Sequence, residues 1–182
     1  MKTIGLTLLA ILATASISAQ DRIEDEKDKV FDTKHELRLG VIKLLAGPIF
    51  EGGYEYIIDS NQGVGAYVLA NFDSSNDWFE NYSLTPYYRM YFQTKEDYGA
   101  KGFFVEGFTS FFSSDFDLED SLFGDANNED VFDISIGLSV GKKWINTTGF
   151  VFEAKFGAGR NLLGNADVDA LIKFDFYIGY RF

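Results

Sequence analysis

The last twelve residues of the chain carry the pattern that most restricts its fold. Every second residue from Ile172 to Phe182 is apolar or aromatic, whereas the residues between them include both signs of charge. Successive side chains of a β-strand point to opposite faces, so one face of this segment is apolar and the other is polar. A strand of about ten residues with these two faces is typical of a transmembrane barrel, where the apolar face meets lipid. The pattern therefore predicts a barrel strand in a bacterial outer membrane.

The same alternation recurs along the chain between stretches of turn residues. We expect strands at residues 35–45, 49–58, 63–72, 82–92, 102–112, 131–144, 150–161 and 171–182. Strand 63–72 is ambiguous, because its small residues allow either face to be apolar. Pro86 cannot donate a ladder hydrogen bond, so it predicts a bulge or a local gap. The fold class expected is all-β, an eight-stranded antiparallel up-and-down transmembrane β-barrel over residues 35–182.

Composition supports strands over helical membrane spans. The 182-residue chain is 46% hydrophobic and 17% aromatic, yet its mean hydropathy is only −0.07 because the apolar residues are dispersed.

The chain has no cysteine, which excludes disulfides and cysteine zinc sites. The net charge of −12 argues against nucleic acid as a partner. His35 is the one histidine, so histidine-assisted catalysis would depend on it; we expect a structural or solvated side chain instead.

The N-terminal residues 1–19 are interpreted as a signal peptide. Lys2 supplies the positive region, Ile4 to Ala13 the apolar region, and small residues precede a cleavage site after Ala19. Cleavage would remove one lysine and no acid, which leaves the mature chain at −13. Residues 20–34 follow as a strongly charged, flexible lead-in, with a short helix as the alternative.

The polar faces of the expected strands converge on the lumen. Eight strands enclose a space that side chains just fill, so we expect a salt-bridged plug, with an ion or proton path as the alternative. Asp133 belongs to this polar face in the strand 131–144. The charged residues expected in this lumen network are Glu36, Arg38, Glu51, Glu55, Arg89, Glu106, Glu153, Lys155, Lys173, Asp175 and Arg181.

Closure of the barrel requires the last strand to pair antiparallel with the first, because an open edge does not persist in lipid. In the expected register Arg181 lies within ion-pair reach of Glu36 at the periplasmic end. At a watery barrel mouth such a pair would contribute at most about 1 kcal/mol.

The long acidic connection 113–130 contains alternating acids over Asp115–Asp120. It lacks the glycine at the sixth place and the glutamate at the twelfth place of a calcium loop. We therefore expect a solvated surface loop, and no metal or cofactor.

Several motifs also resemble a known family, that of the small outer-membrane β-barrel proteins of the Bacteroidota, which has no assigned function. The motifs are Ser83–Arg89, Gly102–Gly107, Gly157–Asn161 and Gly179–Phe182, and the resemblance extends from Glu36 to Phe182. The resemblance implies a barrel and an outer-membrane location, but no catalytic residue. The end of the chain also resembles the signal read by barrel-assembly machinery, with Tyr180 and Phe182 in the expected places.

Together these features predict a small non-enzymatic outer-membrane barrel with a filled polar lumen and acidic extracellular loops, in a structural or surface-interaction role. Its expected partners are outer-membrane lipid and lipopolysaccharide, and the barrel-assembly machinery during insertion; it is expected to be a monomer. One alternative is an outer-membrane lipid-modifying enzyme. The other is a soluble periplasmic lipid-binding barrel, which would turn its apolar faces inward.

Overall fold

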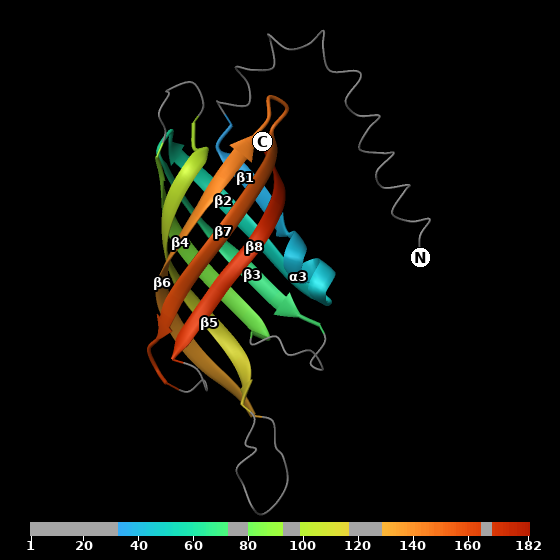
Figure 1. Ribbon diagram of the computed structural model, residues 1–182, viewed down its shortest axis with the longest axis vertical. Helices are drawn as coiled ribbons and strands as arrows, with labels where there is room; N and C mark the ends of the chain where they lie inside the picture. The colour runs from blue at the N-terminus through green and yellow to red at the C-terminus, as the bar shows by residue number, and fades with distance from the viewer. Residues whose placement is uncertain (1–32, 73–79, 93–98, 117–128, 165–168) are drawn as a thin grey trace, which may run out of the picture.

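The strands of the protein close into a single barrel (Figure 1). The computed structural model describes residues 33–72, 80–92, 99–116, 129–164 and 169–182. The expected signal peptide and most of the lead-in, residues 1–32, therefore lie outside the described residues. The strands are β1 (His35–Gly40), β2 (Ile49–Asp59), β3 (Gln62–Asn71), β4 (Tyr82–Phe92), β5 (Gly102–Phe116), β6 (Glu129–Ile145), β7 (Phe150–Asn161) and β8 (Ala170–Arg181). Each strand pairs antiparallel with its neighbours in the chain, and β1 pairs with β8, which confirms the eight-stranded up-and-down barrel.

The two faces of the wall differ sharply in chemistry. Along β4 the exposed and buried residues alternate without a break, with Tyr82, Tyr88 and Met90 outside and Arg89 inside. The other strands follow the same rule. The large side chains exposed on the outside include Phe50, Val68, Phe92, Phe103, Phe132, Ile136, Leu138, Val140, Phe152, Phe156, Ile172, Phe174 and Ile178. The barrel is thus apolar outside and charged inside.

The prediction of a strand over residues 35–45 is wrong for its second half, residues 41–45. β1 ends at Gly40, and residues Val41–Ala46 form the short helix α3. A strand continued past Val41 in the same alternation would point Lys43 outward and Ile42 inward, among the charges. The helical turn instead buries Lys43 and exposes Ile42 and Leu44. Within the described residues no helix is long and apolar enough to cross a membrane.

Two open points of the sequence are settled by the strand register. In β3 the inward residues include Tyr67 and Leu69, each 1% exposed, whereas Val64 and Val68 face outward. At Pro86 the described pairing with β5 lapses between Leu84 and Tyr87 without a shift of register, so the residue produces a gap and no bulge.

Aromatic rings lie flat along the inner wall where the adjacent strand carries glycine. Phe108 of β5 faces Gly137 of β6, and Phe104 faces Gly141. A Cβ atom on Gly137 would lie 2.6 Å from a ring carbon of Phe108, and one on Gly141 would lie 2.4 Å from Phe104. These glycines therefore make the room that large rings need inside a narrow barrel.

Closure occurs at the end where both termini of the barrel lie. The backbone of His35 exchanges two hydrogen bonds with that of Phe182, at 3.2 and 2.8 Å. The next pair inward is Glu36 with Arg181. This register is the one expected from the sequence.

Candidate functional site

All eleven charged residues expected in the lumen point into the barrel. Each is at most 5% exposed, including Lys155 and Arg38. The structure places ten of them in two clusters, and the eleventh, Lys173, pairs with Glu80 instead. The central network, nearer the termini, contains Glu36, Arg38, Glu55, Arg89, Glu106, Lys143, Glu153, Lys155 and Arg181. The α3 triad, farther along the lumen, contains Lys43, Glu51 and Asp175.

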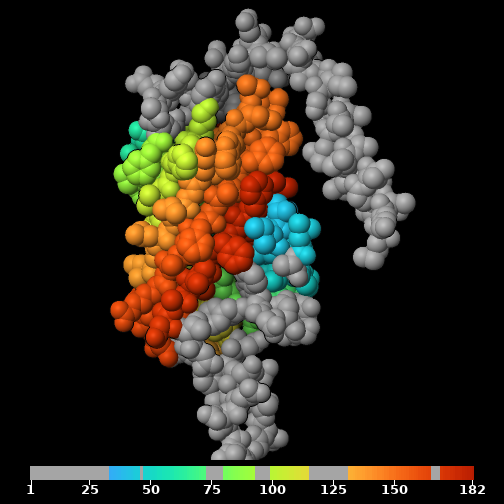
Figure 2. All heavy atoms as spheres, in the orientation of Figure 1, coloured from blue at the N-terminus to red at the C-terminus, as the bar shows by residue number. Residues whose placement is uncertain are grey.

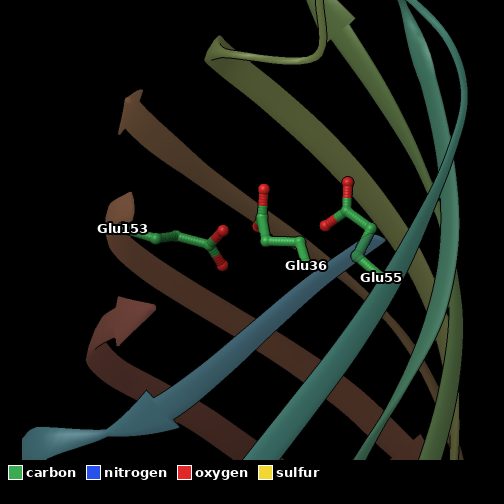
Figure 3. Close-up of side chains that lie close together, drawn as sticks. All are labelled: Glu36, Glu55 and Glu153. Carbon is green, nitrogen blue, oxygen red and sulfur yellow. The ribbon is translucent and has the colours of Figure 1, made fainter. Parts of the chain in front are cut away.

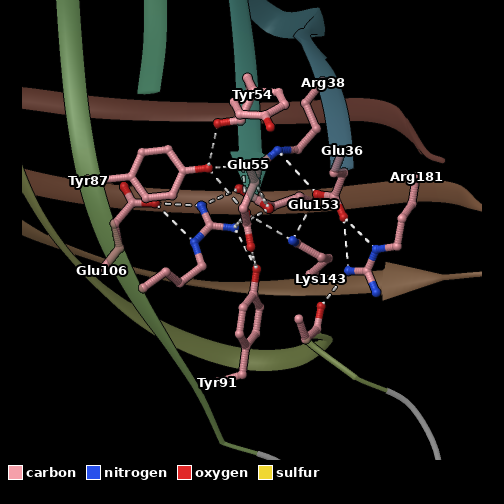
Figure 4. Close-up of polar contacts among 12 residues, drawn as sticks. Glu36, Arg38, Tyr54, Glu55, Tyr87, Tyr91, Glu106, Lys143, Glu153 and Arg181 are labelled. Carbon is pink, nitrogen blue, oxygen red and sulfur yellow. Dashed lines mark hydrogen bonds and ion pairs between the residues drawn. The ribbon is translucent and has the colours of Figure 1, made fainter. Parts of the chain in front are cut away.

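Arg89 of β4 forms ion pairs with three carboxylates of the central network, those of Glu55, Glu106 and Glu153. Figure 4 labels these three carboxylates. The guanidinium nitrogens of Arg89 donate to Glu106 at 2.5 and 3.0 Å and to Glu153 at 2.7 and 3.0 Å. A further bond of 3.1 Å reaches Glu55. One cation thus joins carboxylates from β2, β5 and β7, which are distant in the sequence.

Four other cations complete this network: Arg38, Lys143, Lys155 and Arg181. Arg38 donates to Glu55 at 2.7 Å and also to Glu153. Lys143 lies between two carboxylates, 2.8 Å from Glu36 and 3.0 Å from Glu55. Every carboxylate of the central network therefore has at least one cationic partner.

Arg181 provides the predicted partner of Glu36 at 2.9 Å. The expectation of a watery setting is wrong, because both side chains are at most 1% exposed. Residues just before β5 contribute to this burial, because Arg181 also donates to the carbonyl groups of Gly99 and Ala100, at 2.8 and 2.9 Å.

Tyrosine side chains fill the space between the charges. Tyr67 accepts a hydrogen bond of 2.9 Å from Arg89 and donates to Glu153 at 3.1 Å. The ammonium group of Lys155 lies 3.6 Å from the centre of the Tyr67 ring, which is a close cation–π contact. The Phe104 ring covers Arg89 in the same way, at 3.8 Å.

The α3 triad ties the helix to the two strands that flank it. Lys43 donates to Glu51 of β2, and its ammonium nitrogen is 3.5 Å from Asp175 of β8. Asp175 also accepts a hydrogen bond of 2.9 Å from the backbone nitrogen of Ile42. Nearby, Lys173 donates to Glu80 at 2.7 Å.

A group of three carboxylates meets the distance requirement of a metal site. Oxygen atoms of Glu36, Glu55 and Glu153 all lie within 4.8 Å of one another, and Figure 3 shows the three side chains converging from different strands. The carboxylates of these three residues already form ion pairs with Arg38 and Lys143. The group is therefore part of the ion-pair network, and the chemistry of its partners favours a structural role. The predicted acidic loop lies largely outside the described residues.

Sequence analysis missed several members of these clusters. Lys143 continues the inward period of β6 two residues beyond Gly141, so counting one step further along that strand would have found it. Lys43 and Glu80 carry no strand period, because one lies in a helix and the other precedes β4. Among the inward tyrosines, Tyr87, Tyr91 and Tyr177 fall on the polar faces of the expected strands, as the structure has them. Tyr67 gave no signal, because the facing of strand 63–72 was ambiguous.

The predicted assembly residues lie on the outer surface. Tyr180 and Phe182 are 47% and 52% exposed, and Phe182 stacks on the ring of His35 at 6.0 Å. The ring nitrogen Nδ1 of His35 is 2.7 Å from the hydroxyl of Tyr54. His35 is therefore part of an aromatic cluster outside the wall, away from the central network.

The outer wall also carries an apolar groove, with a volume of about 730 Å³. The small residues among its lining are Gly52, Gly53, Ala66 and Gly179. Its larger lining residues include Leu37, Leu39, Phe50, Val68, Ile178 and Tyr180.

The arrangement of charges in the lumen suits the role of holding the strands together. Opposite charges buried together compensate the cost of removing each from water only when their pairing is nearly complete. The central network meets this condition through many short contacts between cations and carboxylates. Such an arrangement holds the strands of a barrel together from the inside.

In comparisons with protein-family models, with curated proteins and with solved structures, nothing matches this chain. The resemblance to the Bacteroidota barrel family therefore stays a prediction.

Proposed function

We propose that the protein is a small outer-membrane β-barrel whose lumen is filled by ion pairs, with a structural or surface-interaction role and no enzymatic activity. The observation that carries this proposal is the inverted distribution of side chains. Large apolar side chains on seven of the strands, β2 to β8, face outward, whereas the inside holds arginine, lysine and glutamate. A surface of this kind is unfavourable in water and favourable in lipid.

The soluble lipid-binding alternative requires the opposite distribution. Such a barrel keeps an apolar interior for its ligand, whereas Glu106, Arg89 and Glu153 are fully buried inside this one. The lipid-modifying enzyme is also less well supported, because His35 lies outside the wall against Tyr54 and Phe182. The membrane barrel therefore accounts for more of the observed geometry.

In the proposed orientation both termini face the periplasm, and the β5–β6 connection faces outward from the cell. Its acids, within residues 113–130, would form the surface presented to other molecules. Lipid and lipopolysaccharide would contact the apolar wall, and barrel-assembly machinery would read Tyr180 and Phe182 during insertion. The filled barrel would act as a monomer.

Cell fractionation tests the location. We expect the protein in the outer-membrane fraction, resistant to carbonate extraction, with faster gel migration before boiling than after it. Recovery in the soluble periplasmic fraction would refute the proposal.

Topology is tested by a matched pair of serine substitutions in a chain without native cysteine. Ser121→Cys, in the β5–β6 connection, should react with an impermeant maleimide on intact cells. Ser60→Cys, in the turn between β2 and β3, should react only after the outer membrane is permeabilised. The reverse result would show the opposite orientation.

A further inference from the structure

The wall of the barrel is interrupted beside β1. This strand has 6 residues, whereas its neighbours β2 and β8 have 11 and 12. Its described pairing with β8 ends at Gly40 and Tyr177, and its pairing with β2 ends at Leu39 and Gly52. Both neighbours continue past these pairs, and over that stretch α3 takes the place of a wall strand.

A short helix covers less of the wall than a strand of the same length. Six helical residues extend about 9 Å, whereas six residues of strand extend about 20 Å. Figure 2 shows the cyan atoms of this part of the chain at the surface, beside the red atoms of β8. The chain between Val41 and Ala46 thus fills a break in the ladder without continuing it.

The polar contacts of Lys43 and Ile42 in α3 with the barrel lie on the inner side of the helix. They are made by the Lys43 side chain and the Ile42 backbone, and they end on Glu51 and Asp175. On the outer side Leu44 and Leu45 are 47% and 81% exposed. An isolated helix of this length is unstable, so the position of α3 depends on the triad.

The apolar groove on the outer wall begins next to this helix. Leu39 lies two residues before α3 begins at Val41, and Phe50 lies at the start of β2, four residues after α3 ends at Ala46. An acyl chain in the groove would therefore have its end close to the charges of the α3 triad. The apolar groove would hold the single acyl chain of an amphiphile, and the buried charges of the α3 triad would lie close to its polar head.

We propose that α3 is a lateral door in the barrel wall, held closed by Lys43, Glu51 and Asp175, that admits single-chain amphiphiles of the bilayer to the half of the lumen away from the termini. This inference rests on the proposed membrane location. Displacement of α3 would open a path from the groove to the triad while the central network keeps the other half of the barrel closed.

Hydrogen exchange of the folded protein in detergent tests the door without a membrane. Lys43→Met keeps the length of the side chain and removes its charge, so the amides of residues 45–47, which donate within the helix, should exchange at least about tenfold faster than in the parent protein. Lys142→Met is the matched control, because Lys142 lies outside, over the rings of Phe103 and Trp144. It should leave exchange in α3 unchanged.

Unchanged exchange of α3 in a folded Lys43→Met protein would overturn the proposal, as would an equal increase in β7. If that variant does not fold, Asp175→Asn takes its place. It removes one charge of the triad and keeps an oxygen that can accept from Ile42.

Lateral access is tested in liposomes with a cysteine behind the door. Leu69→Cys is suitable, because Leu69 faces inward, is 1% exposed and pairs with Glu51. N-dodecylmaleimide dissolved in the bilayer should modify this cysteine at least about tenfold faster when Lys43→Met is also present. A maleimide on polyethylene glycol, added to the water, should remain slow in both proteins.

Equal acceleration of both reagents would indicate a general opening of the barrel and would overturn the lateral route; so would no acceleration of either. A protein that fails to enter liposomes would instead contradict the proposed membrane location. Hydrogen exchange in detergent would still decide the behaviour of α3 in that case.

Discussion

At the scale of single residues, the stability that a lumen charge contributes depends on how many buried partners would lose an ion pair if that residue were substituted. Arg89 contacts Glu55, Glu106 and Glu153, so its loss leaves three buried carboxylates short of one cation. Removing one partner of a buried ion pair is costly because the remaining charge stays out of water. An exposed arginine has no such effect.

We therefore expect Arg89→Met to lower the free energy of unfolding by about 3–5 kcal/mol. The matched control is Arg160→Met on β7, where the arginine side chain is exposed, and its effect should stay within about 0.5 kcal/mol. Urea unfolding, followed by the gel shift of the folded barrel, measures both. Similar stabilities of the two variants would contradict a cohesive role for the network.

The facing of individual residues could be predicted wherever a strand alternates clearly, as it does for Glu106, Glu153 and Lys173. Partners could not be predicted in the same way. The contact between Arg89 and Glu153 depends on how the barrel wraps β4 and β7 around the lumen, and neither strand contains that information alone.

At the scale of elements, the sequence pattern predicted the limits of β4 and β7 at both ends. It failed at α3, because a run of apolar residues around Lys43 fits a strand by composition. Only the position of Lys43 relative to the alternation of β1 shows that a strand would place the charge on the wrong side. The facing of β3 was undetermined because Gly63, Gly65 and Ala66 fit either side.

Closure between β8 and β1 is tested by two pairs of cysteines. His35 and Phe182 form a hydrogen-bonded pair, so Glu36 and Arg181 form the adjacent pair whose side chains lie close on one face. Glu36→Cys with Arg181→Cys should form a disulfide under mild oxidation. Glu36→Cys with Tyr180→Cys should not, because Tyr180 faces outward. Crosslinking of the second pair alone would show that the inner and outer faces of β8 are exchanged.

At the scale of the whole molecule, the barrel is a wall of apolar side chains around a core of ions and aromatic rings. Arg89, Tyr67, Tyr177 and Phe104 are among its largest fully buried side chains. These side chains occupy the lumen where a wider barrel would hold water. The molecule is therefore expected to be a closed cylinder.

Planar-bilayer recording measures this closure directly. We expect no steady conductance of the porin type from the reconstituted protein, because the central network fills the cross-section. Arg89→Met should also give no large channel, since Tyr67 and Phe104 remain in place. A stable open channel in the parent protein would disprove the filled lumen.

The contacts of Arg181 also restrict the order in which parts of the barrel can fold. This residue lies at the C-terminal end of β8, yet it donates hydrogen bonds to the carbonyl groups of Gly99 and Ala100, which precede β5. Ala100 has a positive φ of 48°, a conformation that few residues other than glycine adopt unaided. Gly99 and Ala100 can therefore reach their final conformation only after β8 has taken its place in the barrel. A chain truncated before Arg181 would carry a fault far from the cut, where a protease could recognise the unfinished protein.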